Sequence, residues 1–281
     1  MKQVIVFDIG GTQSRIALLE NNQIIWRDQL ATPGQDGPAA MLDVMAQLYQ
    51  QLSHLDAPVA VAVTGQIVDG CVTAHNPALL PGWDSYPLQQ RLSEKLDRTV
   101  LIYNDARAAA WGEYRFGTGQ GCHEFLFLTV STGIGAGLIL NRRLHLAKNG
   151  FDAEIGEMKT EGGITLEDRA SGSALNALAI QHGYADAKAF CDAAERGDAR
   201  ANTLYRHGIA EIAKKLADLA VMLGIQRVAV GGSVGLRPGY LQRLETEMNS
   251  YPAIYRFELL AARLGHDAGL YGAAALATEQ S

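Results

Sequence analysis

The sequence contains only three cysteines, Cys71, Cys122 and Cys191, which lie far apart along the chain. None of them forms a CxxC pair, so the pattern indicates neither a structural zinc site nor a disulfide framework. Scattered thiols of this kind are typical of reduced cytosolic proteins. We therefore expect a cytoplasmic protein without disulfides.

Long apolar runs and an excess of basic residues are also absent. No apolar run approaches the roughly 18–20 residues that a membrane helix needs, and the N-terminus lacks the basic start and cleavage site of a signal peptide. The net charge is −6. Because an acidic chain repels phosphate backbones, we expect neither a membrane nor a nucleic acid as partner.

The 281 residues, 48% of them hydrophobic, are enough to bury a proper core. Residues 3–9 form an apolar run that predicts a buried strand, and residues 14–19 predict a second strand after Gly10-Gly11-Thr12. A tight glycine turn between two strands is a β-hairpin. This context excludes a P-loop or Rossmann loop, in which the glycines lead into a helix.

The rest of the chain alternates between the two element types. We predict further strands at residues 23–30, 59–65, 99–105, 125–132, 135–141 and 227–232, and helices at 37–54, 87–96, 106–114, 166–183, 186–196, 198–223, 237–249 and 268–278. The strand–glycine turn–strand pattern recurs at Gly133–Gly135, which indicates an internal duplication. We expect an α/β protein with mixed sheets.

Three glycine-rich segments could hold phosphates, since glycines let backbone N–H groups approach oxygen atoms closely. In the first, Asp8–Thr12, the Thr12 hydroxyl could also donate and Asp8 could hold Mg²⁺ through water. The second is Ser131–Gly137, and the third, Gly231–Gly235, lies between a predicted strand and a predicted helix. The alternatives are a plain hairpin turn, a glycine-kinked hairpin and a tight strand-to-helix turn.

Two further groups of polar residues could act on a hydroxyl substrate. Asn104 and Asp105 end a predicted buried strand, and a carboxylate there could take the proton of an attacking hydroxyl, although Asp105 could equally cap the next helix. The carboxylates Glu154, Glu157 and Glu167 could accept from sugar hydroxyls. Spacing alone does not separate these three from ordinary surface acids.

Taken together, these motifs resemble the ROK family (repressor, open reading frame, kinase) of sugar kinases and sugar-sensing repressors. The resemblance runs over nearly the whole chain and rests on FDIGGT at 7–12, VTGQIVDG at 63–70, NDARAAAWGEY at 104–114, TVSTGIGAG at 129–137 and HDAGLYGAAALA at 266–277, with shorter matches between them. It implies an actin-like ATPase (ribonuclease H-like) fold of two lobes with a central cleft. We expect an N-terminal lobe at 1–115, a C-terminal lobe at 116–266, and a helix at about 267–281 that packs back on the first.

The resemblance is strongest to those family members that phosphorylate the 6-hydroxyl of N-acetylmannosamine in sialic acid breakdown. It implies ATP and Mg²⁺ as cofactors, a homodimer, and Asp105 as general base. Sugar contacts are implied for Asn76, Asn104, Glu154 and Glu167, and we expect Asp105 and Glu157 to contact the sugar as well. ATP contacts are implied for Asp8, Gly10, Gly11, Thr12, Thr132, Gly133, Gly135 and Gly137. We add Gly231 and Gly232 because they lie at the end of a predicted strand. Glucose and N-acetylglucosamine stay open as alternative substrates.

The chain departs from the family pattern at one place. Many members have EIGH, whose histidine binds zinc, followed by a loop with three cysteine ligands. Here the segment reads Glu154-Ile155-Gly156-Glu157, and the loop is shortened to EGGITLE at 161–167. All four zinc ligands are missing together, so we expect no zinc site and expect Glu157 to replace the histidine's sugar contact.

Two other functional classes fit the sequence less well. A sugar-sensing repressor would need an N-terminal DNA-binding helix-turn-helix, for which the chain has no room before Asp8. An actin-like filament or chaperone ATPase would need additional subdomains. An ATP-dependent hexose or hexosamine kinase therefore remains the favoured prediction.

Overall fold

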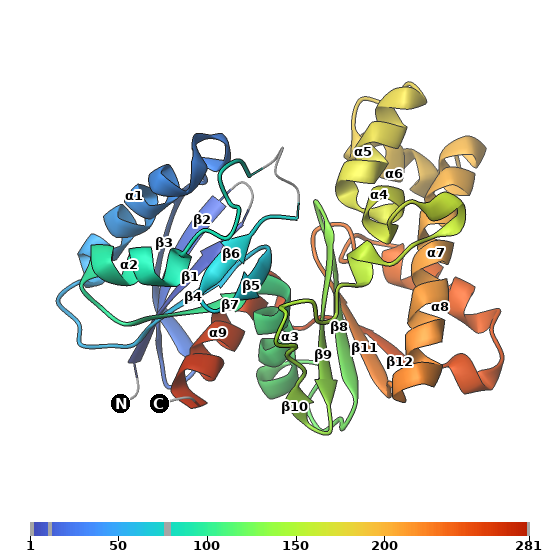
Figure 1. Ribbon diagram of the computed structural model, residues 1–281. Coiled ribbons are helices and arrows are strands. Elements are labelled where there is room, and N and C mark those ends of the chain that lie inside the picture. The colour runs from blue at the N-terminus through green and yellow to red at the C-terminus, as the bar shows by residue number, and fades with distance from the viewer. Residues whose placement is uncertain (1–2, 11–12, 76–79, 280–281) are drawn as a thin grey trace. The chain divides into compact units, whose positions relative to one another are not determined.

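The computed structural model describes residues 3–10, 13–75 and 80–279 (Figure 1). The chain forms two compact units. Unit 1 comprises Met1–Phe116, Leu146–Asp152 and His266–Ser281, and unit 2 comprises Gly117–His145 and Ala153–Gly265. After the chain has entered unit 2, it thus returns to unit 1 twice, at residues 146–152 and at residues 266–281.

The sheet of unit 1 has five strands in the order β3-β2-β1-β4-β7. Their bounds are β1 Gln3–Ile9, β2 Gln13–Glu20, β3 Gln23–Ala31, β4 Val59–Val63 and β7 Val100–Asn104. The first three strands form an antiparallel meander, whereas β4 and β7 run parallel to β1. The carboxyl ends of β1, β4 and β7 therefore lie at one edge of the sheet, where Asp8 and Asn104 lie.

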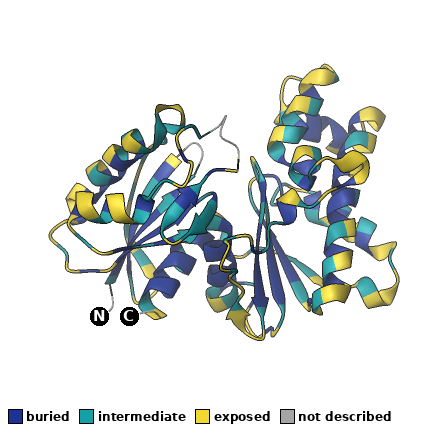
Figure 2. Cartoon of the chain, in the orientation of Figure 1, coloured by how far each residue is buried: buried dark blue, intermediate teal, exposed yellow. Residues whose placement is uncertain are grey.

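Helices cover both faces of this sheet. Alternate residues of β1 point to opposite faces, so Ile5 and Phe7 pack with α1 (Gly37–Tyr49) and α2 (Leu88–Leu96), whereas Val4 and Val6 pack against α9 (Ala268–Glu279). Helix α3 (Asp105–Phe116) lies beside α9 on the second face. Figure 2 shows buried strands within the unit and exposed outer faces on α1 and α2.

A short segment from the middle of the sequence completes unit 1. Residues 146–152 lie against the hairpin of β5 (Gln66–Val68) and β6 (Cys71–Thr73), where the Gln66 side-chain amide donates to the carbonyl of Asn149 over 2.5 Å. Gly150 has a φ of +68°, and a methyl group there would lie 2.5 Å from the Ile67 carbonyl oxygen. Glycine is required there by both the backbone angle and the close approach.

The sheet of unit 2 repeats the arrangement of unit 1. Its order is β10-β9-β8-β11-β12, with bounds β8 Phe125–Val130, β9 Ile134–Leu140, β10 Arg143–Leu144, β11 Arg227–Gly231 and β12 Glu258–Ala261. Again the first three strands are antiparallel and the last two run parallel to the first. This common topology agrees with the internal duplication that the two glycine turns predict.

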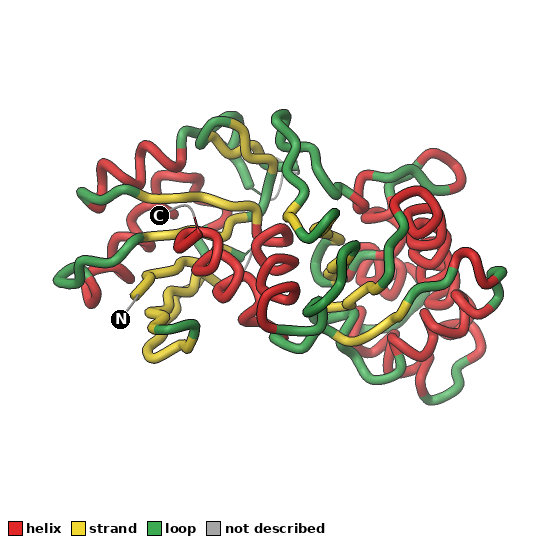
Figure 3. The backbone as a smooth tube through the Cα atoms, turned by 90° about the horizontal axis from the view of Figure 1, so that it is seen from below, coloured by secondary structure: helices red, strands yellow, loops and turns green. Residues whose placement is uncertain are grey.

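The helices of unit 2, red in Figure 3, gather on one face of its sheet. They are α4 Leu166–Ala170, α5 Gly172–Gln181, α6 Ala187–Glu195, α7 Ala199–Leu223 and α8 Tyr240–Asn249. Leu126, Leu128 and Val130 of β8 form one apolar core with residues of these helices. Short 3₁₀ turns complete the fold: Gly34–Asp36, Gln50–Leu52, Ile155–Glu157, Glu161–Gly163, Ala253–Tyr255 and Gly265–Asp267.

The element predictions differ from the structure at a few places. The helix expected at 166–183 is interrupted at Ser171, whose backbone is extended and whose hydroxyl accepts from the N–H of Ala174 over 3.1 Å. Strands β5, β6, β10 and β12 were not predicted, because each has only two to four residues. Within the described residues no helix is long and apolar enough to span a lipid bilayer.

Candidate active site

The first predicted phosphate turn joins β1 to β2. The N–H of Gly10 donates to the carbonyl of Gln13 over 3.0 Å, and the Gly10 carbonyl accepts from the Thr32 hydroxyl over 2.8 Å. These bonds make a hairpin, as the sequence predicts, and they already use the Gly10 N–H. Gly11 and Thr12, which we expect to contact phosphate, lie outside the described residues, as does the predicted sugar contact Asn76.

Asp8 lies at the end of β1 directly opposite Arg15 of β2, and the two side chains form an ion pair. Arg15 also lies 3.4 Å from Asp267 and donates to the carbonyl of His266 over 2.6 Å. Burial raises the pKa of the Asp8 carboxyl, and the Arg15 guanidinium opposes this rise. A buried carboxylate of this kind fits one Mg²⁺ contact, since Mg²⁺ in phosphate sites often has only one or two carboxylate ligands.

Asn104 and Asp105 mark the junction of β7 and α3. The Asn104 side-chain oxygen accepts from the backbone N–H of Arg107 over 3.1 Å, so Asn104 caps the helix. Asp105 is the first residue of α3, and its carboxylate accepts from the N–H of Ala106 over 2.8 Å. The capping role that was the alternative reading of Asp105 is thus performed mainly by its neighbour.

The second predicted phosphate turn joins β8 to β9 in unit 2. The N–H of Ser131 donates to the carbonyl of Gly133 over 2.9 Å. The first two N–H groups of α5 also bond to this turn. The Gly172 N–H donates to the Ser131 carbonyl over 2.7 Å, and the Ser173 N–H donates to the Thr132 carbonyl over 3.1 Å. Thr132 is exposed and Gly133 partly so, whereas Gly135 and Gly137 already belong to β9.

Glu167 reaches this second turn from α4. Its Oε2 accepts from the N–H of Ile134 over 2.8 Å, and a methyl group on Gly133 would lie 2.5 Å from the same oxygen. The lack of a side chain at Gly133 therefore leaves room for the Glu167 carboxylate. The structure thus connects a predicted sugar contact to a predicted phosphate turn within unit 2.

Glu154 and Glu157 flank the 3₁₀ turn Ile155–Glu157. Glu154 has φ −76° and ψ 62°, and the N–H of Ile155 donates to the Ala153 carbonyl over 2.8 Å, which together form an inverse γ-turn. Ala153 precedes it with φ +56°, an angle that costs free energy for a residue with a Cβ. The backbone is therefore held in an unfavourable conformation immediately before Glu154.

The shortened loop after Glu157 closes on itself through hydrogen bonds. The Thr160 N–H donates to the Ile164 carbonyl over 2.8 Å, the Leu166 N–H donates to the Met158 carbonyl over 2.9 Å, and the Arg169 guanidinium donates to the Glu161 carbonyl over 2.9 Å. In the part of the chain that the structure describes, no three His, Cys, Asp or Glu side chains form a group that could hold a metal ion. The expected absence of a zinc site stays a prediction.

The third glycine segment differs from its prediction. Helix α8 begins at Tyr240 and not directly after β11, so Gly231–Gly235 does not lead straight into a helix as the sequence predicts. The N–H groups of Val234 and Gly235 donate to the Val130 carbonyl over 2.9 and 3.0 Å. Gly232 has φ +84° and lies too close to the Val130 carbonyl for any side chain. The segment is a tight turn, and the ATP contacts expected for Gly231 and Gly232 stay a prediction.

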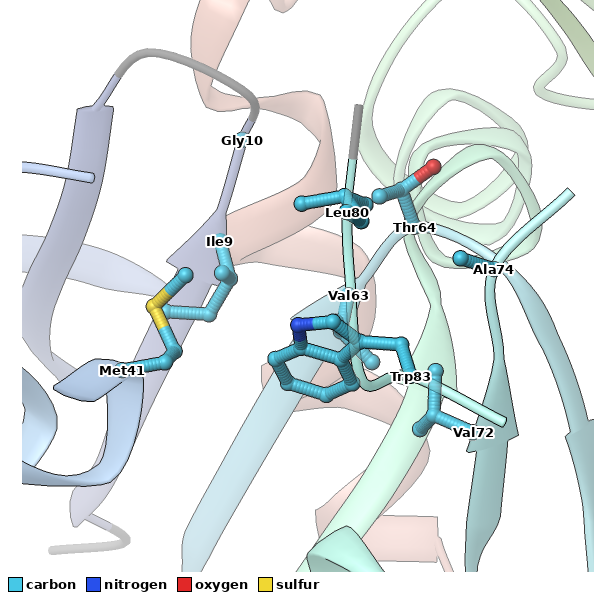
Figure 4. A pocket seen from close by; sticks show the side chains of 9 residues that line it. All are labelled: Ile9, Gly10, Met41, Val63, Thr64, Val72, Ala74, Leu80 and Trp83. Atoms are coloured by element: carbon cyan, nitrogen blue, oxygen red, sulfur yellow. The ribbon is translucent and has the colours of Figure 1, made fainter. Parts of the chain in front are cut away.

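A small apolar pocket of unit 1 lies next to Gly10. Figure 4 shows the side chains that line it, among them Met41 and Trp83. Its cavity volume is about 10 Å³, which is room for one water molecule. This pocket is therefore too small to accept a sugar or a nucleotide.

The sequence reading missed two arginines that contact predicted site residues. Arg15 pairs with Asp8, and Arg107 contacts Asn104 and Asp152. The signal was weak in both cases, since an arginine is usually a solvated surface residue. For Arg15 the register of the predicted hairpin would have placed it opposite Asp8, whereas Asp152 is 45 residues from Arg107 and only the tertiary structure brings them together.

Comparisons with known proteins agree with this reading. The chain is 35% identical over 280 residues to the N-acetylmannosamine kinase of Haemophilus influenzae. The match covers 96% of this chain and 93% of that protein. It is 34% identical over 278 residues to the bifunctional enzyme NanE/NanK of Brucella melitensis, of whose length it spans only 54%.

A solved structure extends the similarity to the fold. The ROK family glucokinase of Streptomyces griseus, in complex with glucose and AMPPNP, superimposes with a TM-score of 0.84, 28% identity and coverage of 99% of both chains. This similarity confirms the predicted two-lobed, actin-like fold class. Because the ROK family pattern matches residues 4–280 and a kinase relative matches nearly the whole chain, the chain belongs to the ROK family as a sugar kinase, an ATP-dependent phosphotransferase.

Proposed function

We propose that this kinase transfers the terminal phosphoryl group of ATP to the 6-hydroxyl of N-acetylmannosamine, in sialic acid breakdown. The observation that carries the proposal is the 35% identity to an N-acetylmannosamine kinase over 96% of the chain. The polar residues at the carboxyl ends of β1 and β7 support it, because a kinase needs a carboxylate beside the attacking hydroxyl.

In this proposal Asp105 is the general base. Its place in the first turn of α3 favours the ionised carboxylate, since the helix N-terminus carries partial positive charge. The ionised Asp105 orients the sugar hydroxyl and accepts its proton as the oxygen bonds to phosphorus. Sugar hydroxyls are held by Asn76, Asn104, Glu154, Glu157 and Glu167.

The phosphates of ATP contact the glycine turns at Asp8–Thr12 and at Thr132–Gly137, with Gly231 and Gly232 as further contacts. Asp8 would hold Mg²⁺ through water, and the ion would supply positive charge that neutralises the phosphate oxygens. Arg15, already paired with Asp8, adds a fixed positive charge at the first turn.

We propose that the enzyme works without zinc. The hairpin after Glu157 is closed by hydrogen bonds of Thr160 and Arg169, so it has a defined shape without a metal ion. Glu157 then takes the place of the family's histidine. As a carboxylate it can only accept from sugar hydroxyls, whereas a neutral histidine can also donate.

Glucokinase or N-acetylglucosamine kinase activity is the alternative. It is favoured by the structural similarity to a glucokinase, and the three sugars differ only around C2. A sugar-sensing regulator without catalysis is less favoured, because the chain is 35% identical to an N-acetylmannosamine kinase over 96% of its length. We also propose that the protein is a cytoplasmic homodimer. In each subunit, residues 1–115 form the first lobe, residues 116–266 form the second, and the helix at about 267–281 packs on the first lobe.

An ATP-coupled assay with a panel of sugars tests this function. N-acetylmannosamine should give the highest kcat/KM, followed by N-acetylglucosamine and glucose. Activity should survive prior treatment with a zinc chelator such as 1,10-phenanthroline when Mg²⁺ is present in excess. A higher kcat/KM for glucose would favour the alternative, and loss of activity with chelator that returns on adding Zn²⁺ would contradict the zinc-free proposal.

A further inference from the structure

The side chain of Arg107 is buried in unit 1 directly beside Asn104. Only 4% of the Arg107 side chain and 5% of the Asp152 side chain are exposed. The Arg107 Nε donates to the Asp152 carboxylate over 3.0 Å, and its Nη2 donates to the Asp152 carbonyl. Its Nη1 donates to the Asn104 Oδ1 over 3.1 Å. One guanidinium thus links the residue before the proposed base to the segment at 146–152.

These contacts fix the orientation of the Asn104 side chain. Its Oδ1 accepts from both the backbone N–H and the Nη1 of Arg107, and its Nδ2 donates to the Gly65 carbonyl over 3.0 Å. A guanidinium has only donors, so the amide oxygen must face it. The amide nitrogen carries a second hydrogen, which this orientation makes available as a donor to a hydroxyl oxygen.

We propose that Arg107 is a positioning residue for the sugar: it holds Asn104 as a hydrogen-bond donor and fixes the first turn of α3, which carries Asp105. This inference rests on the proposed function. It gives the buried ion pair of Arg107 and Asp152 a role in sugar binding in addition to any role in stability. Such a pair is a poor way to stabilise a fold, because desolvation of the two charges offsets much of their attraction.

A purely structural role would act through the Asp152 contact alone. Asp152 also accepts from the Ala147 N–H over 3.1 Å, so the pair could simply attach residues 146–152 to α3. The two roles differ in what happens when both charges are removed. Removing one leaves a buried charge unpaired, whereas removing both relieves that penalty and still leaves Asn104 without its side-chain partner.

The test compares Arg107→Met, the double variant Arg107→Met/Asp152→Asn, and Arg107→Lys. The single Met variant should lower the Tm, and the double variant should recover most of that loss. Both should raise the KM for N-acetylmannosamine at least tenfold and change the KM for ATP less than twofold. Arg107→Lys should restore the sugar KM only in part, because an ammonium cannot span both partners as the planar guanidinium does.

A matched control is the ion pair of the half-buried Arg98 with the fully exposed Asp56, which lie 2.8 Å apart. The variant Arg98→Met/Asp56→Asn should keep wild-type kinetic constants. If the wild-type enzyme is active and the Arg107→Met/Asp152→Asn variant keeps the wild-type sugar KM, the positioning role is wrong and the pair is structural. If the wild-type protein phosphorylates no sugar in the panel, the proposed function fails and the role of Arg107 fails with it.

Discussion

At the scale of single residues, the proposed chemistry depends on carboxylates whose surroundings differ. Asp8 is paired with Arg15 and buried, Asp105 lies at the start of a helix, and Glu167 accepts from a backbone N–H of a turn. Asp105 and Glu167 can each be tested by a substitution that removes the carboxylate. A loss of proton transfer should lower kcat, whereas a loss of binding should raise a KM.

Asp105→Asn should lower kcat by about 10²–10⁴, since a general base contributes a rate factor of that size. The amide keeps an oxygen that can accept from Ala106, so the fold and sugar binding should change little. Steady-state kinetics and calorimetric titration with sugar check both expectations. Asp56→Asn, at a fully exposed position, serves as the control, and a wild-type kcat in the Asp105 variant would remove it as the base.

Glu167 and Gly133 should behave as a coupled pair. Glu167→Ala leaves the buried N–H of Ile134 without its acceptor, which should lower the free energy of unfolding by about 1–3 kcal/mol. Gly133→Ala should push the carboxylate away and raise the KM for ATP.

A double-mutant cycle checks this coupling by denaturant unfolding and kinetics. Because both changes disturb the same contact, the double variant should cost less than the sum of the two single variants. Additive effects would show that Glu167 does not hold the phosphate turn.

At the scale of secondary structure elements, the close packing of α3 against α9 supports the helix that carries Asp105. Small residues line this contact. A methyl group on Gly272 would overlap the carbonyl of Ala108, and one on Gly112 would meet the Ala268 carbonyl and the Gly272 nitrogen. The backbones of α3 and α9 therefore approach each other more closely than larger side chains allow.

Gly272→Ala should lower the free energy of unfolding by roughly 3 kcal/mol or more, because neither helix backbone can yield without moving the other. Gly208→Ala in α7 is the matched control: its new methyl group would meet the nearest atoms at 3.4 Å, an ordinary contact. Since alanine favours a helix more than glycine, the control should be neutral or stabilising by up to about 1 kcal/mol. Equal Tm values for the two variants would contradict this account.

At the scale of the whole molecule, both units bury tyrosines at cost to their ionised forms. Burial raises the pKa of Tyr103 in unit 1 to about 12. In unit 2, burial also raises the pKa of Tyr205 and of Tyr240, whose hydroxyl has no hydrogen-bond partner among the described residues. The folded chain therefore holds these protons more tightly than the unfolded chain does.

The stability should consequently fall as the pH rises above about 10. There the unfolded tyrosines lose protons while the folded ones keep them, so each group lowers the stability as the pH rises toward its folded pKa. The partly buried Tyr103 contributes less than the fully buried Tyr240. Urea unfolding at pH 8 to 11.5 measures this loss. Tyr103→Phe and Tyr240→Phe should each make the decline shallower, and an unchanged slope in both variants would contradict the assignment.

The sequence alone determined the order of most elements and the two glycine hairpins. Apolar runs such as Val59–Val63 and Gln3–Ile9 are local patterns that the chain carries in itself. The family resemblance also came from local motifs, and the comparisons confirm it. Short strands such as β12 could not be predicted, because four residues hold too little pattern.

Only the tertiary structure decided which residues support the proposed site residues. Arg107 and Asp152 meet because residues 146–152 return to unit 1, and Glu167 reaches Ile134 because α4 packs beside β9. Such contacts join residues more than 30 positions apart, and no local pattern encodes them. The sequence therefore indicated the proposed chemistry through Asp8 and Asp105, whereas burial and long-range hydrogen bonds decided how the residues around these positions are held in place.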